Sequence, residues 1–139
     1  MGSESLTPHL SNTEVNMTII EAITQIDKLK PNTFEQIDKI RWLSLLDGVI
    51  KTEIIDTHEG GSEVVFTGYD ESTPLDTKLF VPAPYDHLYL RWLEAQIDYY
   101  SNEIAKYNNS ITLYNTAYSA FERYYNRKNM PIQHKLKFF

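Results

Sequence analysis

The chain has 139 residues, of which 42% are hydrophobic and 23% charged, and its formal net charge is −6. This composition is typical of one globular domain with a sizeable apolar core. Cysteine is absent, which excludes disulfides, thiolate metal sites and cysteine nucleophiles. No apolar run approaches the ~18 residues that span a bilayer, so we expect no membrane segment.

The charge divides the chain into two parts. Residues 1–120 carry 8 basic and 18 acidic side chains, a net charge of −10, whereas residues 121–139 carry 5 basic and 1 acidic, a net charge of +4. An acidic body with a basic C-terminal extension argues against sequence-specific binding of nucleic acid by the body.

The first part of the chain predicts an arm followed by a helix. Residues 1–16 are polar and lack periodicity, which indicates a flexible N-terminal arm. Thr18 and Glu21 have the spacing of a capping box, and isoleucines follow at helical spacing. We expect this helix to end before Pro31.

A second helix is predicted from Thr33 to about residue 56. Thr33 and Gln36 repeat the capping-box spacing. Large apolar residues follow at helical spacing, namely Ile37, Ile40, Trp42, Leu43, Leu46, Val49, Ile50 and Ile54. Gly48 lies inside this pattern, and we expect either a closely approaching neighbouring backbone or a bend in the helix there.

Residues 57–84 predict a small β-hairpin with a long loop. Segments 63–69 and 77–81 are rich in β-branched and aromatic residues, and turn-forming residues separate them. Between Thr52 and Thr77 the chain has seven acidic residues and no Lys or Arg. We therefore expect a negatively charged lobe that faces solvent.

Over residues 90–125, large and mostly apolar residues repeat at alternating steps of three and four, without Pro or Gly. Such a stripe predicts a seam of the coiled-coil type. A straight helix over 86–126 would be about 60 Å long, whereas a compact domain of this size is roughly 35–40 Å across. We favour two helices, about 86–106 and 110–127, with a turn at 108–110; the uninterrupted stripe leaves a single helix open.

The second half of the stripe is rich in tyrosine, which buries apolar area and keeps a hydroxyl for a polar partner. Aromatic residues at helical spacing are usually core, but one small core would struggle to cover so many rings. We therefore expect part of the stripe to contact another chain. The candidate interface residues are Tyr100, Tyr107, Tyr114, Tyr118, Phe121 and Tyr125.

Residues 128–139 predict a basic C-terminal extension, because Pro131 ends any helix. Two aromatic residues complete it, and we expect them to anchor the extension on a partner or a neighbouring subunit. The candidate anchoring residues are Lys135, Lys137, Phe138 and Phe139.

The sequence offers little material for catalysis. The histidines, His9, His58, His87 and His134, are widely separated and show no metal-ligand spacing. No phosphate loop, dinucleotide fingerprint or nucleophile elbow occurs. We therefore expect a protein that is not an enzyme and needs no cofactor or metal. The predicted fold class is mainly α: a helical bundle of four to five helices over 17–127, one small β-hairpin insertion at about 57–84, and extended terminal arms.

Two segments carry a resemblance to a known family. They are KIRWLSLLDGVIKTEIIDTHEG (39–60) and VPAPYDHLYLRWLEAQIDYYSNEIAKYNNSITLYNTAYSAFERYYNR (81–127). The shared features are a Trp-Leu-x-x-Leu-Asp-Gly helix, an Asp-Thr-His-Glu-Gly turn, a Pro-Tyr-Asp helix start and a Tyr-Asn…Tyr…Phe…Tyr-Asn-Arg ending. Over roughly 17–131 the chain resembles the head–tail connector, or neck adaptor, proteins of tailed bacteriophages and prophages of Gram-positive bacteria.

The resemblance implies a structural protein of the virion neck, between capsid and tail, that passes through the host cytoplasm during assembly. Such proteins are mainly helical and form a homo-oligomeric ring, typically of twelve copies, beneath the portal protein. The ring extends the channel for double-stranded genomic DNA and docks the next neck or tail protein. The resemblance implies no active site.

In that setting we expect acidic residues of the lobe to face the lumen, where they would repel phosphate. These residues are Glu59, Glu63, Asp70, Glu71 and Asp76. Two alternatives stay open: another neck or tail completion protein, which usually has more sheet, and a cytosolic helical protein-interaction module.

Overall fold

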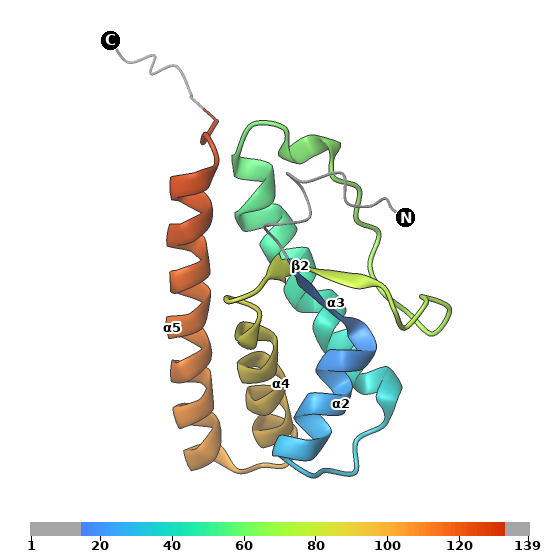
Figure 1. Ribbon diagram of the computed structural model, residues 1–139. Coiled ribbons are helices and arrows are strands. Elements are labelled where there is room, and N and C mark those ends of the chain that lie inside the picture. The colour runs from blue at the N-terminus through green and yellow to red at the C-terminus, as the bar shows by residue number, and fades with distance from the viewer. Residues whose placement is uncertain (1–14, 133–139) are drawn as a thin grey trace.

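The computed structural model describes residues 15–132 and is mainly helical (Figure 1). In chain order the elements are β1 (Asn16–Thr18), α2 (Ile19–Leu29), α3 (Gln36–Glu53), the short 3-10 helices η2 (Ile55–Thr57) and η3 (Gly61–Glu63), β2 (Lys78–Pro82), α4 (His87–Tyr100) and α5 (Ile104–Lys128). The predicted fold class is confirmed, because four α-helices within the described residues accompany one small two-stranded antiparallel sheet.

Helix α2 begins where the sequence predicts. Thr18 Oγ1 accepts a hydrogen bond from the backbone N–H of Glu21 (3.2 Å), and the Glu21 carboxylate accepts one from the N–H of Thr18 (2.9 Å). The N–H of Ile19 donates to the carbonyl of Thr77 at 3.0 Å. The loop before β2 therefore completes the cap that the sequence motif begins.

The N-cap of helix α3 is Glu35, two residues after the predicted cap at Thr33. Its first turn is closed at Glu35, whose N–H donates to the Asp38 carboxylate at 3.2 Å. Asn32 forms a separate turn by accepting the N–H of Phe34 at 3.0 Å, which keeps this segment out of the helix. The helix then runs through Gly48 without interruption.

The two-stranded sheet contains the predicted strand near residues 77–81, but the strand that pairs with it is not the predicted one. Strand β2 coincides with the predicted second strand, but it pairs with β1, in a register that places Asn16 opposite Pro82 and Thr18 opposite Lys78. The prediction that 63–69 supplies the partner strand is wrong. Strand β1 directly precedes α2, whose first N–H group binds the carbonyl of Thr77 in the loop before β2, so this contact continues into the pairing of β1 with β2.

The two predicted arms fall mostly outside the described residues. Residues 1–14 and 133–139 lie outside them, and with them the candidate anchors Lys135, Lys137, Phe138 and Phe139. Asn16, which the sequence assigns to the arm, belongs to β1, where its side-chain amide donates to the carbonyl of Leu79 at 2.8 Å.

The aromatic stripe forms two helices, but the turn lies earlier than predicted. Residues 101–103 separate α4 from α5, and Asn102 has a φ of 60°, a left-handed conformation that asparagine tolerates better than most residues. The prediction of a turn at 108–110 is wrong. Ser110 lies inside α5, where its hydroxyl donates to the Asp98 carboxylate of α4 at 2.9 Å and so joins the two helices.

The core lies between the sheet, α2, α3 and the antiparallel hairpin of α4 and α5 (Figure 1). Burying each large apolar side chain contributes roughly 1.5–3 kcal/mol. The carboxylate of Asp98 is also buried, and Lys30 Nζ lies 2.9 Å from its Oδ1. The largest fully buried side chains are Tyr89, Phe121, Ile19, Ile26, Leu43, Leu46, Ile50, Ile54, Leu79, Leu88, Leu93 and Val81.

Candidate interaction surface

The candidate interface residues of the stripe do not all lie on the surface. Tyr114 and Phe121 are buried in the core of their own chain, so they leave very little side-chain surface for a partner. Tyr100 is 54% exposed. The half-buried residues are Tyr107, Tyr118 and Tyr125. The stripe folds back between α4 and α5, so much of its seam closes within one chain.

An exposed aromatic patch lies at the tip of the α4–α5 hairpin, and we call it the aromatic tip. Its residues Tyr99, Tyr100 and Ile104 are 50%, 54% and 55% exposed. The Tyr100 ring stacks on Trp42 of α3, with centroids 5.6 Å apart, and the Tyr99 ring contacts Tyr107 at 5.4 Å. These contacts hold large rings in water at fixed positions, which is typical of a protein–protein contact.

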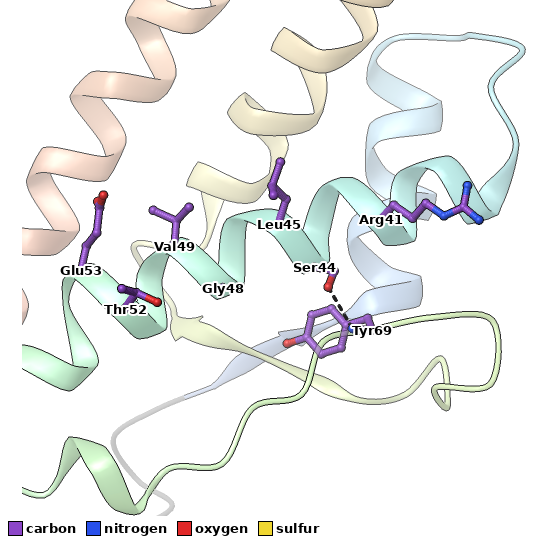
Figure 2. Close-up of a pocket in the computed structure, with 8 residues that line it drawn as sticks. All are labelled: Arg41, Ser44, Leu45, Gly48, Val49, Thr52, Glu53 and Tyr69. Carbon is purple, nitrogen blue, oxygen red and sulfur yellow. Dashed lines mark hydrogen bonds between the residues drawn. The ribbon is translucent and has the colours of Figure 1, made fainter.

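A shallow groove follows the outer face of α3 (Figure 2). Leu45, which is 59% exposed, and Val49 form its apolar middle, while Arg41 and Glu53 lie toward its opposite ends. The lining residues are Arg41, Ser44, Leu45, Gly48, Val49, Thr52, Glu53 and Tyr69. An open groove of this kind suits a protein segment better than an enclosed small-molecule substrate.

Tyr118 of α5 contacts the end of α3 beside this groove. Its hydroxyl donates to Glu53 Oε1 at 2.7 Å. Burial, together with the Glu53 carboxylate, raises the pKa of Tyr118 well above its ordinary value of 10.0, so the hydroxyl remains a donor. The contact fixes α5 against α3 although the two residues are far apart in the sequence.

The carboxylate of Asp47 is the buried polar centre of the fold. Its Oδ2 accepts the Tyr69 hydroxyl at 2.5 Å and the N–H of Phe80 at 3.3 Å, and its Oδ1 accepts the Tyr89 hydroxyl at 2.6 Å. The Tyr89 hydroxyl in turn accepts the N–H of Val81 at 2.8 Å. One side chain of α3 therefore joins β2, α4 and the segment before β2.

Burial is the main cause of the raised pKa values of the three acidic groups in this cluster. It raises the pKa of Asp47 from 3.8 to about 6, although the hydrogen bonds from Tyr69, Tyr89 and Phe80 act in the opposite direction. Burial and the nearby carboxylate also raise the pKa of Tyr69 and of Tyr89 well above 10.0. Both hydroxyls thus stay protonated, and Asp47 has a structural role.

Residues 63–69, which we call the strap, pass over α3 in place of the predicted hairpin. The Phe66 ring lies over Gly48, where an added Cβ would stand 3.7 Å from Phe66 Cε2. The N–H of Tyr69 donates to Ser44 Oγ at 2.9 Å (Figure 2). The neighbour that approaches Gly48 is therefore an aromatic side chain and not a backbone.

The acidic residues proposed for the lumen lie on the surface around the strap. Asp70 accepts the N–H and the hydroxyl of Ser72 at 2.9 and 2.7 Å, and these bonds lower the pKa of Asp70. The exposed acidic residues are Glu59, Glu63, Asp70, Glu71 and Asp76. They form a solvated negative surface on irregular chain and not on a β-hairpin.

Two of the sequence motifs meet at His58. Its ring nitrogens lie 2.6 Å from the carbonyl oxygen of Ile54 and 2.7 Å from Asn126 Oδ1, and the ring packs edge-on against Tyr125 with centroids 4.7 Å apart. His58 also forms an antiparallel bridge with Pro131. The Asp-Thr-His-Glu-Gly turn and the Tyr-Asn-Arg ending therefore hold the end of α5 against η2.

Within residues 15–132, there is no cluster of three or more His, Asp or Glu side chains that could bind a metal ion. No helix in that part of the chain is both long and apolar enough to cross a bilayer. No family model, curated protein or solved structure matches the chain.

Proposed function

We propose that this chain is a head–tail connector protein of a tailed bacteriophage, which assembles as a ring beneath the portal, extends the DNA channel and docks the next neck or tail protein. The observation that carries the proposal is the resemblance over 17–131. Its two segments, 39–60 and 81–127, are joined by polar contacts in the fold: Asp47 binds Tyr89, and His58 binds Asn126.

The exposed apolar surfaces support an assembling protein. In a ring, each subunit contacts its two neighbours through two different patches, because the contact is head-to-tail. Such a contact closes into a ring when the rotation between neighbouring subunits divides evenly into a full turn. The aromatic tip and the α3 groove are two such patches on one chain. The mainly helical fold also favours a connector over the more strand-rich tail completion proteins.

The acidic surface around the strap supports a channel role. Carboxylates that face the lumen repel the phosphate backbone, so DNA passes without being held. Replacing Glu59, Glu63 and Glu71 by Gln should alter DNA passage or retention while rings still form. Loss of ring assembly in this variant would instead show that the carboxylates serve the subunit contacts.

Co-sedimentation with the purified portal protein of the same phage tests the proposal. We expect several copies of the chain to travel with each portal, and Tyr100→Ser at the aromatic tip to reduce that number. Asn115→Ser, on an exposed polar position of α5, is the matched control and should bind as the unaltered chain does. A monomer or dimer at every concentration, with portal present, contradicts the proposal and favours a cytosolic interaction module.

A further inference from the structure

The strap is irregular chain that contains a short extended stretch with no strand beside it. Val64 has φ and ψ of −81° and 119°, within the extended region. Phe66 turns toward α3, whereas Glu63, Val65 and Thr67 are exposed, Val65 to 82%. Over residues 65–67 this alternation is that of a short strand with one face toward the protein and one face in water. The stretch is bounded by Val64, which is 37% exposed, and by Gly68, which has a φ of 96°.

The middle of the strap also lacks backbone pairing with the rest of the described chain. Within residues 15–132, the N–H and C=O groups of residues 65–68 make no hydrogen bond. An extended, β-branched segment with open backbone groups is a template for a strand from another chain. Natural proteins usually protect such an edge, so an exposed one indicates a partner that covers it.

We propose that residues 133–139 of a second copy of this chain add to the strap as a β-strand. The inference rests on the proposed function, because a contact from the tail of one copy to the strap of the next is directional and suits a ring. It gives the basic extension a definite receptor on the neighbouring subunit.

The sequence of the extension complements the strap. Lys135 and Lys137 alternate with Leu136 and Phe138, so a strand over 133–139 would present basic side chains on one face and apolar ones on the other. The strap and its flanks carry exposed carboxylates of Glu63, Asp70 and Glu71. Cross-strand pairs of opposite charge stabilise such a pairing.

The other segment outside the described residues does not fit this surface. Residues 1–14 carry Glu4 and Glu14 and contain no Lys or Arg. A strand from that segment would bring like charges together, which destabilises the pairing.

The course of the chain before residue 133 favours a second copy over the same copy. The N–H of Glu59 donates to the carbonyl of Met130, and the N–H of Ile132 donates to the carbonyl of Thr57, both at 2.9 Å. The chain end therefore runs antiparallel to residues 57–59. The described part of the chain thus ends at Ile132, held beside Thr57 in a pairing separate from the strap.

The absence of cysteine from the chain permits a direct test. One preparation carries Thr67→Cys in the strap, and a second preparation, distinguished by mass, carries a single cysteine in place of Lys135, Leu136 or Lys137. The two are mixed at high concentration under mild oxidation. We expect a disulfide between the two different chains, with a yield that falls as salt is raised. Asn115→Cys on the outer face of α5 replaces Thr67→Cys as the control and should give only background.

A second pair of variants separates strand addition from simple proximity. Val65→Pro removes an N–H that has no partner within the described residues and fits the extended conformation of Val64, so the fold and the Tm should be kept. In the Thr67→Cys chain it should lower the interchain disulfide several-fold, whereas Val65→Thr should leave it unchanged. Equal yields for both variants would overturn the added strand.

The outcomes distinguish this inference from the proposed function. A disulfide within one chain, in a variant that carries both cysteines, would overturn the second-copy assignment. Absence of the interchain disulfide in every pair would overturn the inference, and binding to the portal would then report on the proposed function separately. An interchain disulfide without portal binding would support the inference and contradict the connector role.

Discussion

Replacement of Asp47 by Asn should change how the stability of the fold depends on pH. The Asp47 side chain has no exposed surface, and burial raises its pKa from 3.8 to about 6. The folded state therefore binds the proton more tightly than the unfolded state does. The stabilisation is fully present below the unfolded pKa of 3.8 and is lost as the pH rises through about 6.

The magnitude follows from the size of this shift. A rise of about two pKa units corresponds to about 3 kcal/mol of differential stability. Between about pH 4 and pH 7, the unaltered chain should lose this much unfolding free energy relative to Asp47→Asn. Asparagine has nearly the same shape, keeps one acceptor oxygen and does not ionise. The other carboxylates titrate in both proteins and cancel in the comparison.

Urea denaturation at a series of pH values measures the effect, with the fluorescence of Trp42 and Trp92 as the signal. Asp76→Asn, at an exposed carboxylate, is the matched control and should follow the unaltered chain. Parallel stability curves for the unaltered chain and Asp47→Asn would refute the reasoning, because they would show that Asp47 has the same pKa in the folded and unfolded states.

Three further substitutions test individual contacts. Ser110→Ala removes the hydroxyl that binds Asp98 and should cost about 1–3 kcal/mol in urea denaturation; an unchanged midpoint would mean that the hydroxyl does not serve the buried carboxylate. Asn102→Val places a β-branched residue at a φ of 60° and should cost about 1–2 kcal/mol, whereas Asn102→Gly should cost little. Tyr100→Ser should lower self-association in sedimentation velocity with little change in Tm, and a large fall in Tm would show that the ring belongs to the core.

The helices could be predicted from local sequence because their signals are local. The Thr18 and Glu21 capping box and the spacing of apolar residues mark α2, and both are properties of a few adjacent turns. The position of the turn between α4 and α5 could not be predicted in this way. Ser110 is a weak helix former by itself, and its hydrogen bond to Asp98 on the other helix keeps it helical.

The strap shows that local strand propensity does not determine which strands pair. Its residues have strand composition, and Val64 has an extended conformation, but composition does not identify a partner strand. The strand that pairs with β2 is β1, whose position follows from the cap of α2.

The burial of the aromatic stripe could not be predicted from the sequence. A stripe of rings signals a seam, but the sequence does not say whether the seam closes within one chain or between two. In the structure, Tyr114 and Phe121 are buried within their own chain, whereas Tyr100 stays exposed. Asp47 was missed because a single acidic residue inside a helix is usually solvated; its two tyrosine partners lie on separate elements.

Electron microscopy of the portal incubated with this chain tests the central claim most directly. The connector role predicts a closed ring of density at the end of the portal that faces the tail, with a channel continuous through both. Portals without added density, at a concentration of the chain that saturates any binding, would contradict it.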